Sequence, residues 1–67
     1  MTVARVTEII SSSKNSFDEA IERGIERAAK KLDNVTGAWI ADQEIVVDDG
    51  KIKAYRVRLK VTFVLKS

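Results

Sequence analysis

The chain is 67 residues long and carries a net charge of +2, with neither cysteine nor histidine. A chain this short forms at most one domain, here residues 1–67, and because it lacks disulfides and the usual zinc ligands, oligomerisation is the remaining common way to stabilise its small core. The nearly balanced charge predicts no nucleic-acid partner, the lack of an apolar run of about 18 residues predicts no membrane partner, and the lack of cysteine and of a signal peptide predicts a cytoplasmic protein.

The first predicted element is a strand. Residues 3–11 are rich in β-branched side chains, which favours a strand that a serine cluster then ends. The polar run S-S-S-K-N over residues 11–15 is typical of a loop.

A helix is predicted next. Ser16 and Glu19 have the spacing of a capping box, in which each side chain accepts a hydrogen bond from the other residue's backbone N–H. Apolar or small residues then recur at every third or fourth position until Asp33-Asn34, which indicates one buried helix face. Gly24 lies in mid-helix, where it costs about 1 kcal/mol relative to alanine, and this predicts that the helix approaches a sheet closely there.

Two strands are predicted at the C-terminal end, over residues 37–47 and 52–65. The sequence Asp48-Asp49-Gly50-Lys51 between them is a strong hairpin signal. In the last strand apolar and polar residues alternate, so one face is apolar. That face consists of Tyr55, Val57, Leu59, Val61, Phe63 and Leu65. The predicted fold class is therefore α+β, with the order β-α-β-β and a three-stranded antiparallel sheet partly wrapped around one helix.

The lengths of these elements predict self-association. A strand over residues 52–65 spans roughly 45 Å, whereas the helix spans only roughly 24 Å. One helix therefore leaves part of the apolar face uncovered, including Phe63 and Leu65. In so small a chain the cover must come from other copies, so we expect an obligate homo-oligomer.

The sequence offers little for catalysis. Acid–base and nucleophilic mechanisms need a positioned base and a nucleophile, and the chain has no histidine or cysteine. Asp48 and Asp49 are adjacent carboxylates, but at a hairpin tip such residues usually serve the turn. We therefore predict that the protein is not an enzyme.

Charged residues on the strands indicate two kinds of ligand. The stripe Arg56, Arg58 and Lys60 can neutralise phosphates on an anionic ligand, or it can form a solvated or inter-subunit strand face. Residues 42–44 (D-Q-E) offer oxygen ligands to Ca²⁺ or Mg²⁺. Since adjacent strand residues cannot all face one ion, a metal site would need carboxylates from neighbouring chains.

Trp39 is the only tryptophan, and it lies near the start of a predicted strand. A large ring there needs cover. One interpretation is an interface anchor, because tryptophan is enriched in buried contacts between chains. The other is a stacking platform for a flat aromatic ligand.

Three segments in this order resemble the dodecin family over nearly the whole chain. They are the helix start S-S-S-K-N-S-F-D-E-A, the helix exit E-R-A-A-K-K-L-D-N-V and the closing strand Y-R-V-R-L-K-V-T-F. The resemblance implies a hollow homododecamer of small β-α-β-β chains. It also implies that pairs of flavins are stacked between tryptophans of symmetry-related chains, for storage or quenching and not for catalysis.

The residues at the implied flavin contacts depart from the family pattern. In a gap-free comparison the family's stacking tryptophan falls on Gly37, two residues before Trp39. The family glutamine that hydrogen-bonds the isoalloxazine edge falls on Arg56. In these respects this chain is closer to a branch of the family that lacks this tryptophan, carries the same Tyr-Arg pair and is linked to calcium. The flavin-contacting positions implied for this chain are Thr36, Gly37, Trp39, Asp42 and Arg56.

Two functional hypotheses follow. In the first, a homododecamer sequesters riboflavin, FMN, FAD or a similar flat anionic small molecule, more weakly than typical members. Gly37 leaves room for the Trp39 ring to lean back, and Arg56 can donate to flavin carbonyls but cannot accept from the flavin N3–H. In the alternative, a flavin-free dodecamer binds calcium or serves as a structural shell.

Overall fold

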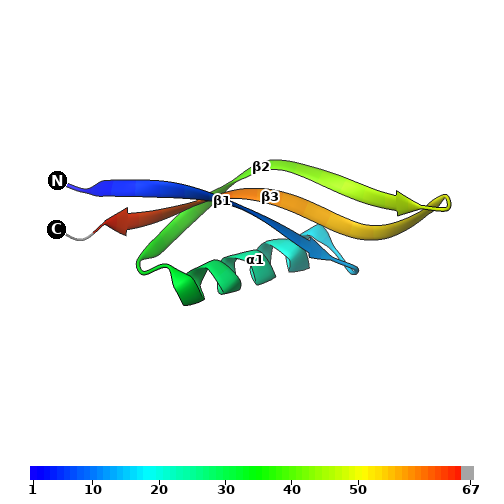
Figure 1. Cartoon of the computed structure of the whole chain (residues 1–67), viewed down its shortest axis with the longest axis horizontal. Helices are drawn as coiled ribbons and strands as arrows, with labels where there is room; N and C mark the ends of the chain where they lie inside the picture. The colour runs from blue at the N-terminus through cyan, green and yellow to red at the C-terminus, as the bar shows by residue number, and fades with distance from the viewer. Residues whose placement is uncertain (66–67) are drawn as a thin grey trace.

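The computed structural model describes residues 1–65, which form one helix and a three-stranded sheet (Figure 1). The elements are β1 (Val3–Ser13), α1 (Phe17–Lys31), β2 (Val35–Asp48) and β3 (Lys51–Leu65). Their order confirms the predicted β-α-β-β arrangement. The strands are one to three residues longer than the sequence predicts, and β2 differs most, since it begins at Val35 and ends at Asp48.

The sheet has the order β1-β3-β2, and β3 pairs antiparallel with both neighbours. The turn between β2 and β3 contains Asp49 and Gly50 with φ of 52° and 73°. Two successive residues with positive φ are the signature of the tight turn that matches strand twist, which confirms the predicted hairpin. The expected loop over residues 11–15 is wrong in its first part, because Ser13 still pairs with Tyr55 of β3. The alternating strand pattern outweighs the local turn preference of serine there.

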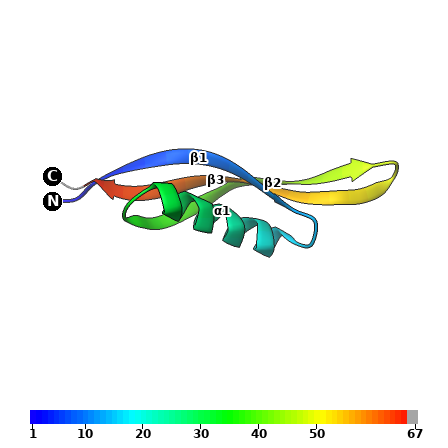
Figure 2. The same cartoon turned by 60° about the horizontal axis from the view of Figure 1, so that its bottom comes forward.

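Helix α1 covers one face of the sheet (Figure 2). The alternation predicted for β3 is confirmed, since Val57, Leu59 and Val61 are fully buried under the helix. Leu65, at the end of the strand, is 42% exposed, as expected for a helix that is shorter than the sheet. Helix α1, within the described chain, has neither the length nor the apolar stretch needed to cross a bilayer.

Gly24 lies at a close contact between the helix and the sheet. A Cβ atom at this position would lie 3.1 Å from Leu59 Cδ1 and 3.1 Å from Ser11 Cβ. These separations are tighter than ordinary van der Waals contact, so only a residue without a side chain fits without a shift. The predicted reason for the mid-helix glycine is confirmed.

Replacing Gly24 with valine is expected to destabilise the folded chain by about 1–3 kcal/mol, because the added methyl groups overpack the helix–sheet contact. Denaturant unfolding at a fixed protein concentration measures the change. Valine has a higher helix propensity than glycine, so a loss of stability reports the contact and not the propensity. Glu22→Val, on the exposed side of the helix, measures the effect of a valine away from the sheet. A Gly24→Val variant that is as stable as the wild type would show that the contact at Gly24 does not matter.

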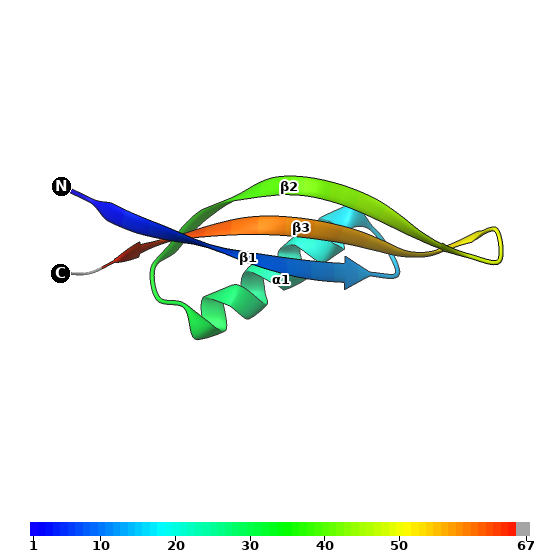
Figure 3. The ribbon, with the colours of Figure 1, turned by 45° about the horizontal axis from the view of Figure 1, so that its top comes forward.

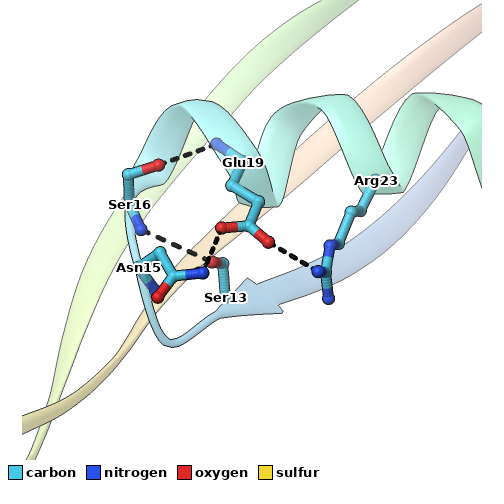
Figure 4. Close-up of polar contacts among 5 residues, drawn as sticks. All are labelled: Ser13, Asn15, Ser16, Glu19 and Arg23. Carbon is cyan, nitrogen blue, oxygen red and sulfur yellow. Dashed lines mark hydrogen bonds and ion pairs between the residues drawn. The ribbon is translucent and has the colours of Figure 1, made fainter.

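The start of α1 is tied to the end of β1 by side chains (Figure 4). Ser16 is the N-cap, and its Oγ accepts from the Glu19 N–H at 3.0 Å. The return bond of the predicted capping box is replaced, because the Ser16 N–H donates to Ser13 Oγ at 3.4 Å. The Glu19 carboxylate instead accepts from Asn15 Nδ2 at 2.6 Å and lies 2.6 Å from Arg23. The hydrogen bond from Asn15 lowers the pKa of Glu19.

The β2–β3 hairpin extends beyond the end of β1 and beyond the N-terminus of α1, and contributes to a longest dimension of 51 Å (Figure 1). Three aliphatic side chains of this extension have no cover. Ile45, Val47 and Ile52 are 46%, 60% and 56% exposed, and the pairing register puts them on the same side of the sheet as the core. The hairpin therefore carries the apolar face of the core out past the helix.

Candidate functional site

Figure 3 views the sheet from the side turned away from α1, and this face is here called the open face. Because Val57, Leu59 and Val61 face the helix, the residues between them on β3 and their partners face the other way. The pairing register arranges them in rows that run β1-β3-β2 across the sheet. The rows are Val6–Thr62–Gly37, Glu8–Lys60–Trp39, Ile10–Arg58–Asp42 and Ser12–Arg56–Glu44.

An irregularity in β2 brings the candidate residues together. Ile40 pairs with Leu59 and Asp42 with Arg58, so Ala41 is left without a partner. This bulge reverses the alternation of side chains, and Trp39 and Asp42, which are three residues apart, therefore share the open face. In a regular strand they would point in opposite directions.

A second irregularity lies between Val35 and Gly37 and leaves Thr36 without a Cα partner. The open face thus includes Gly37, Trp39, Asp42 and Arg56 of the predicted contact set, whereas Thr36 lies in the bulge beside it. Gly37 is a sequence signal for the bulge at Thr36, because an isolated glycine within a strand is typical of a bulge. The bulge at Ala41 has no such signal, and only the pairing with β3 reveals it.

Trp39 is 61% exposed in the single chain and lies on the open face of the edge strand β2. Its strand neighbour Gly37 lies on the same face, and a Cβ atom at Gly37 would have no atom within 4 Å. The space next to the ring is therefore empty. A ring with one accessible face and empty space beside it can stack against a flat partner.

Ion pairs join neighbouring strands in the two rows that follow the row of Trp39 on the open face. Arg56 contacts Glu44 Oε1 through Nε at 2.8 Å and through Nη2 at 2.6 Å. Arg58 hydrogen-bonds Asp42, and its Nη1 lies 3.8 Å from Glu8. The hydrogen bond to Asp42 raises the pKa of Arg58, which stays charged at any physiological pH.

The ion pairs change the expectation for two predicted contacts. Asp42 and Arg56, two of the predicted flavin contacts, share the open face with Trp39, but each already has a partner of opposite charge. All of these side chains are about half exposed, and ion pairs in water contribute little to stability. A ligand can therefore replace one partner of these ion pairs. Its binding free energy is then smaller than it would be if the protein groups were unpaired.

A shallow depression of about 560 Å³ lies on the open face over the rows of Arg58 and Arg56, and Trp39 is not among the residues that line it. Its volume falls in the range of small-molecule sites. The depression is lined by Ile10, Asp42, Gln43, Glu44, Arg56 and Arg58. It is open to solvent along one side, so a ligand held by one chain would remain partly uncovered.

The carboxylates of the open face do not form a metal centre within one chain. Asp42 and Glu44 share the face, while Gln43, which pairs with Val57, points toward the helix side. Across residues 1–65 no group of three or more histidine, cysteine, aspartate or glutamate side chains is gathered closely enough to hold an ion. All three open-face carboxylates, Glu8, Asp42 and Glu44, also lie within ion-pair distance of an arginine.

Comparison with known proteins gives consistent matches. Residues 3–66 match the family model of dodecin. Calcium dodecin from Mycobacterium tuberculosis is 30% identical over 66 residues, a stretch that covers 98% of this chain and 93% of the relative.

Solved structures give the same result. Dodecin from Streptomyces davaonensis has a TM-score of 0.92 and 33% identity, covering 98% of this chain and 97% of that one. The crystal structure of the Mycobacterium tuberculosis calcium dodecin, described as a calcium-chelating antigen with a novel calcium-binding site, has a TM-score of 0.84 and 30% identity. That match covers 96% of this chain and 91% of the other.

Proposed function

We propose a function for this chain from the premise that it belongs to the dodecin family. The protein is a cytoplasmic binding and storage protein, not an enzyme, whose residues 1–67 form a single domain and assemble as a hollow homododecamer. It sequesters riboflavin, FMN, FAD or a similar flat anionic ligand.

The observation that carries this proposal is the position of Trp39. The family's stacking tryptophan corresponds to Gly37, and Trp39 leaves the same face of the same strand roughly 7 Å away. The ring is exposed, and the space above Gly37 is empty. Trp39 therefore serves as a displaced platform for the isoalloxazine ring.

The binding is expected to be weaker than in typical members. Where the family has a glutamine, Arg56 provides only donors, so the flavin N3–H has no acceptor at this position. A buried donor without its partner costs about 1–3 kcal/mol. Arg56 must also exchange its contact with Glu44 for any contact with the ligand.

Assembly is supported by the exposed apolar residues of the single chain. Ile45, Val47 and Ile52 are uncovered at one end of the sheet, and Val3 and Leu65 at the other. When neighbouring copies cover these groups, each Å² of apolar surface removed from water stabilises the assembly by a free energy of about 25 cal/mol. Neighbouring copies also supply the second wall that the shallow depression lacks.

Titration of riboflavin and FMN with the assembled protein tests this function. We expect flavin fluorescence to be quenched at tens of micromolar protein, because a stacked isoalloxazine loses its emission to the neighbouring indole. Light scattering after size exclusion, on the same sample, should give a mass near twelve chains. Absence of quenching from an assembled sample would eliminate the flavin function while leaving the assembly intact.

A second function is supported by the calcium dodecin relative and by the pair Asp42 and Glu44 on one face. In this version, carboxylates from several chains bind calcium in the assembly. Calorimetry with Ca²⁺ on metal-stripped protein tests it, with Asp42→Asn as the variant that should lose the heat of binding. A sample with neither heat of binding nor a change in melting temperature would exclude this function.

Replacing Gly37 with tryptophan is expected to strengthen flavin binding by roughly tenfold, because it restores a ring at the family's stacking position. A Cβ atom at Gly37 meets no atom within 4 Å, so the backbone has room for a side chain at this position. The affinity is read from the same fluorescence titration, and Gly37→Leu is the control for added apolar surface. Equal affinities of the tryptophan and leucine variants would show that stacking is not the cause.

A further inference from the structure

We propose that Lys60 makes the Trp39 site selective for phosphorylated flavins, because its ammonium group binds the phosphate of a flavin whose ring stacks on Trp39. This inference rests on the flavin function proposed above and adds the ligand class to it. FMN and FAD carry such a phosphate, whereas riboflavin does not.

The register puts the ammonium beside the ring. Lys60 is the direct cross-strand partner of Trp39, and both side chains are exposed on the open face. Directly opposite residues of an antiparallel pair have Cβ atoms about 5 Å apart, so their side chains are neighbours. The flexible four-carbon stem of a lysine lets its ammonium follow a group at the ring's edge.

The other cations of the open face are already engaged. Arg56 is held by Glu44, and Arg58 by Asp42 and Glu8. Lys60 makes no ion pair with any of residues 1–65, even though Glu8 is its cross-strand partner on β1. The Glu8 carboxylate lies 3.8 Å from Arg58 Nη1 and pairs with that guanidinium, so it does not neutralise the ammonium of Lys60.

An anionic group that approaches Trp39 therefore meets the ammonium of its cross-strand partner Lys60, which has no ion-pair partner among residues 1–65. A phosphate bound there replaces no existing protein contact, unlike a group that binds Arg56 or Arg58. Hydrogen bonds between an ammonium and a phosphate are charge-assisted and are stronger than those between neutral groups. The ring supplies binding to all flavins, and Lys60 distinguishes the phosphorylated ones.

The experiment compares riboflavin with FMN on the assembled protein, in chelator-containing buffer so that no divalent ion bridges the phosphate to Glu8. We expect FMN to bind roughly tenfold more tightly than riboflavin at low ionic strength, and this ratio to shrink as salt screens the charges. Lys60→Gln should bring the ratio to about one while leaving riboflavin affinity unchanged. Lys60→Arg, which keeps the charge, should retain the preference.

Lys30→Gln, in the last turn of α1, is the matched control, because it removes the same charge far from the open face. It should leave the FMN preference intact. If Lys60→Gln weakens riboflavin and FMN equally, Lys60 contacts the ring system or its stacking partner, and the inference is wrong while the flavin function stands. An FMN preference that survives Lys60→Gln places the phosphate on another group and overturns the inference as well.

Discussion

Replacing Trp39 with alanine is expected to weaken flavin binding roughly 10- to 100-fold. Stacking of a flat heterocycle on an aromatic side chain contributes about 1–3 kcal/mol, and the other contacts at this site are weak, because Asp42 and Arg56 are already paired with protein charges. Trp39 is the only tryptophan, so stacking at the site also quenches all of the protein's indole emission. The loss is measured by titrating FMN into the assembled variant and following flavin fluorescence.

Trp39→Phe is the matched variant, because it keeps a smaller aromatic face. It should retain part of the affinity that Trp39→Ala loses. The mass of the particle that each variant forms shows whether the Trp39 ring is an interface anchor or a stacking platform for the ligand. If Trp39→Ala loses its assembly instead of its ligand, Trp39 is an interface anchor. Affinity within twofold of the wild type, in an intact assembly, would remove Trp39 from the ligand site.

Replacing Ile52 with aspartate is expected to break the dodecamer into smaller particles. Ile52 is 56% exposed in the single chain, next to Val47 on the uncovered part of the hairpin. If a neighbouring copy covers this surface, the variant places an unpaired charge in an apolar contact, and a charge buried without a partner is strongly unfavourable. Light scattering after size exclusion measures the mass.

Ile52→Val is the control, because it keeps the surface apolar and should stay assembled. Circular dichroism checks that the aspartate variant is still folded. Its core, which lies under the helix at Val57, Leu59 and Val61, is not touched by the substitution. A full-size particle formed by Ile52→Asp would mean that the hairpin extension points into solvent, and the apolar surface at Val3 and Leu65 would remain as the candidate contact.

The fold was predictable from the sequence because local and long-range signals agree. The N-cap at Ser16, the turn at Asp49-Gly50 and the clean alternation of β3 each indicate the element that the structure contains. Gly24 even indicated the close contact between helix and sheet. The boundary at Ser13 was not predictable, because strand pairing with Tyr55 outweighs the turn preference of a serine run.

The site was less predictable, and the reason lies in β2. Whether Trp39 and Asp42 share a face depends on the bulge at Ala41, which follows from how β2 pairs with β3 and not from any residue type. The arginine stripe was visible in the sequence, but the partners Glu44, Asp42 and Glu8 were not. Those partners decide which cation remains available to a ligand, and they single out Lys60.

The most direct test of the central claim is a crystal structure of the assembled protein soaked with FMN. We predict density for the isoalloxazine ring against the exposed face of Trp39, over the space left by Gly37, with its phosphate next to Lys60. A Trp39 ring sealed in a contact between chains, with FMN absent or bound on another surface, would contradict the claim.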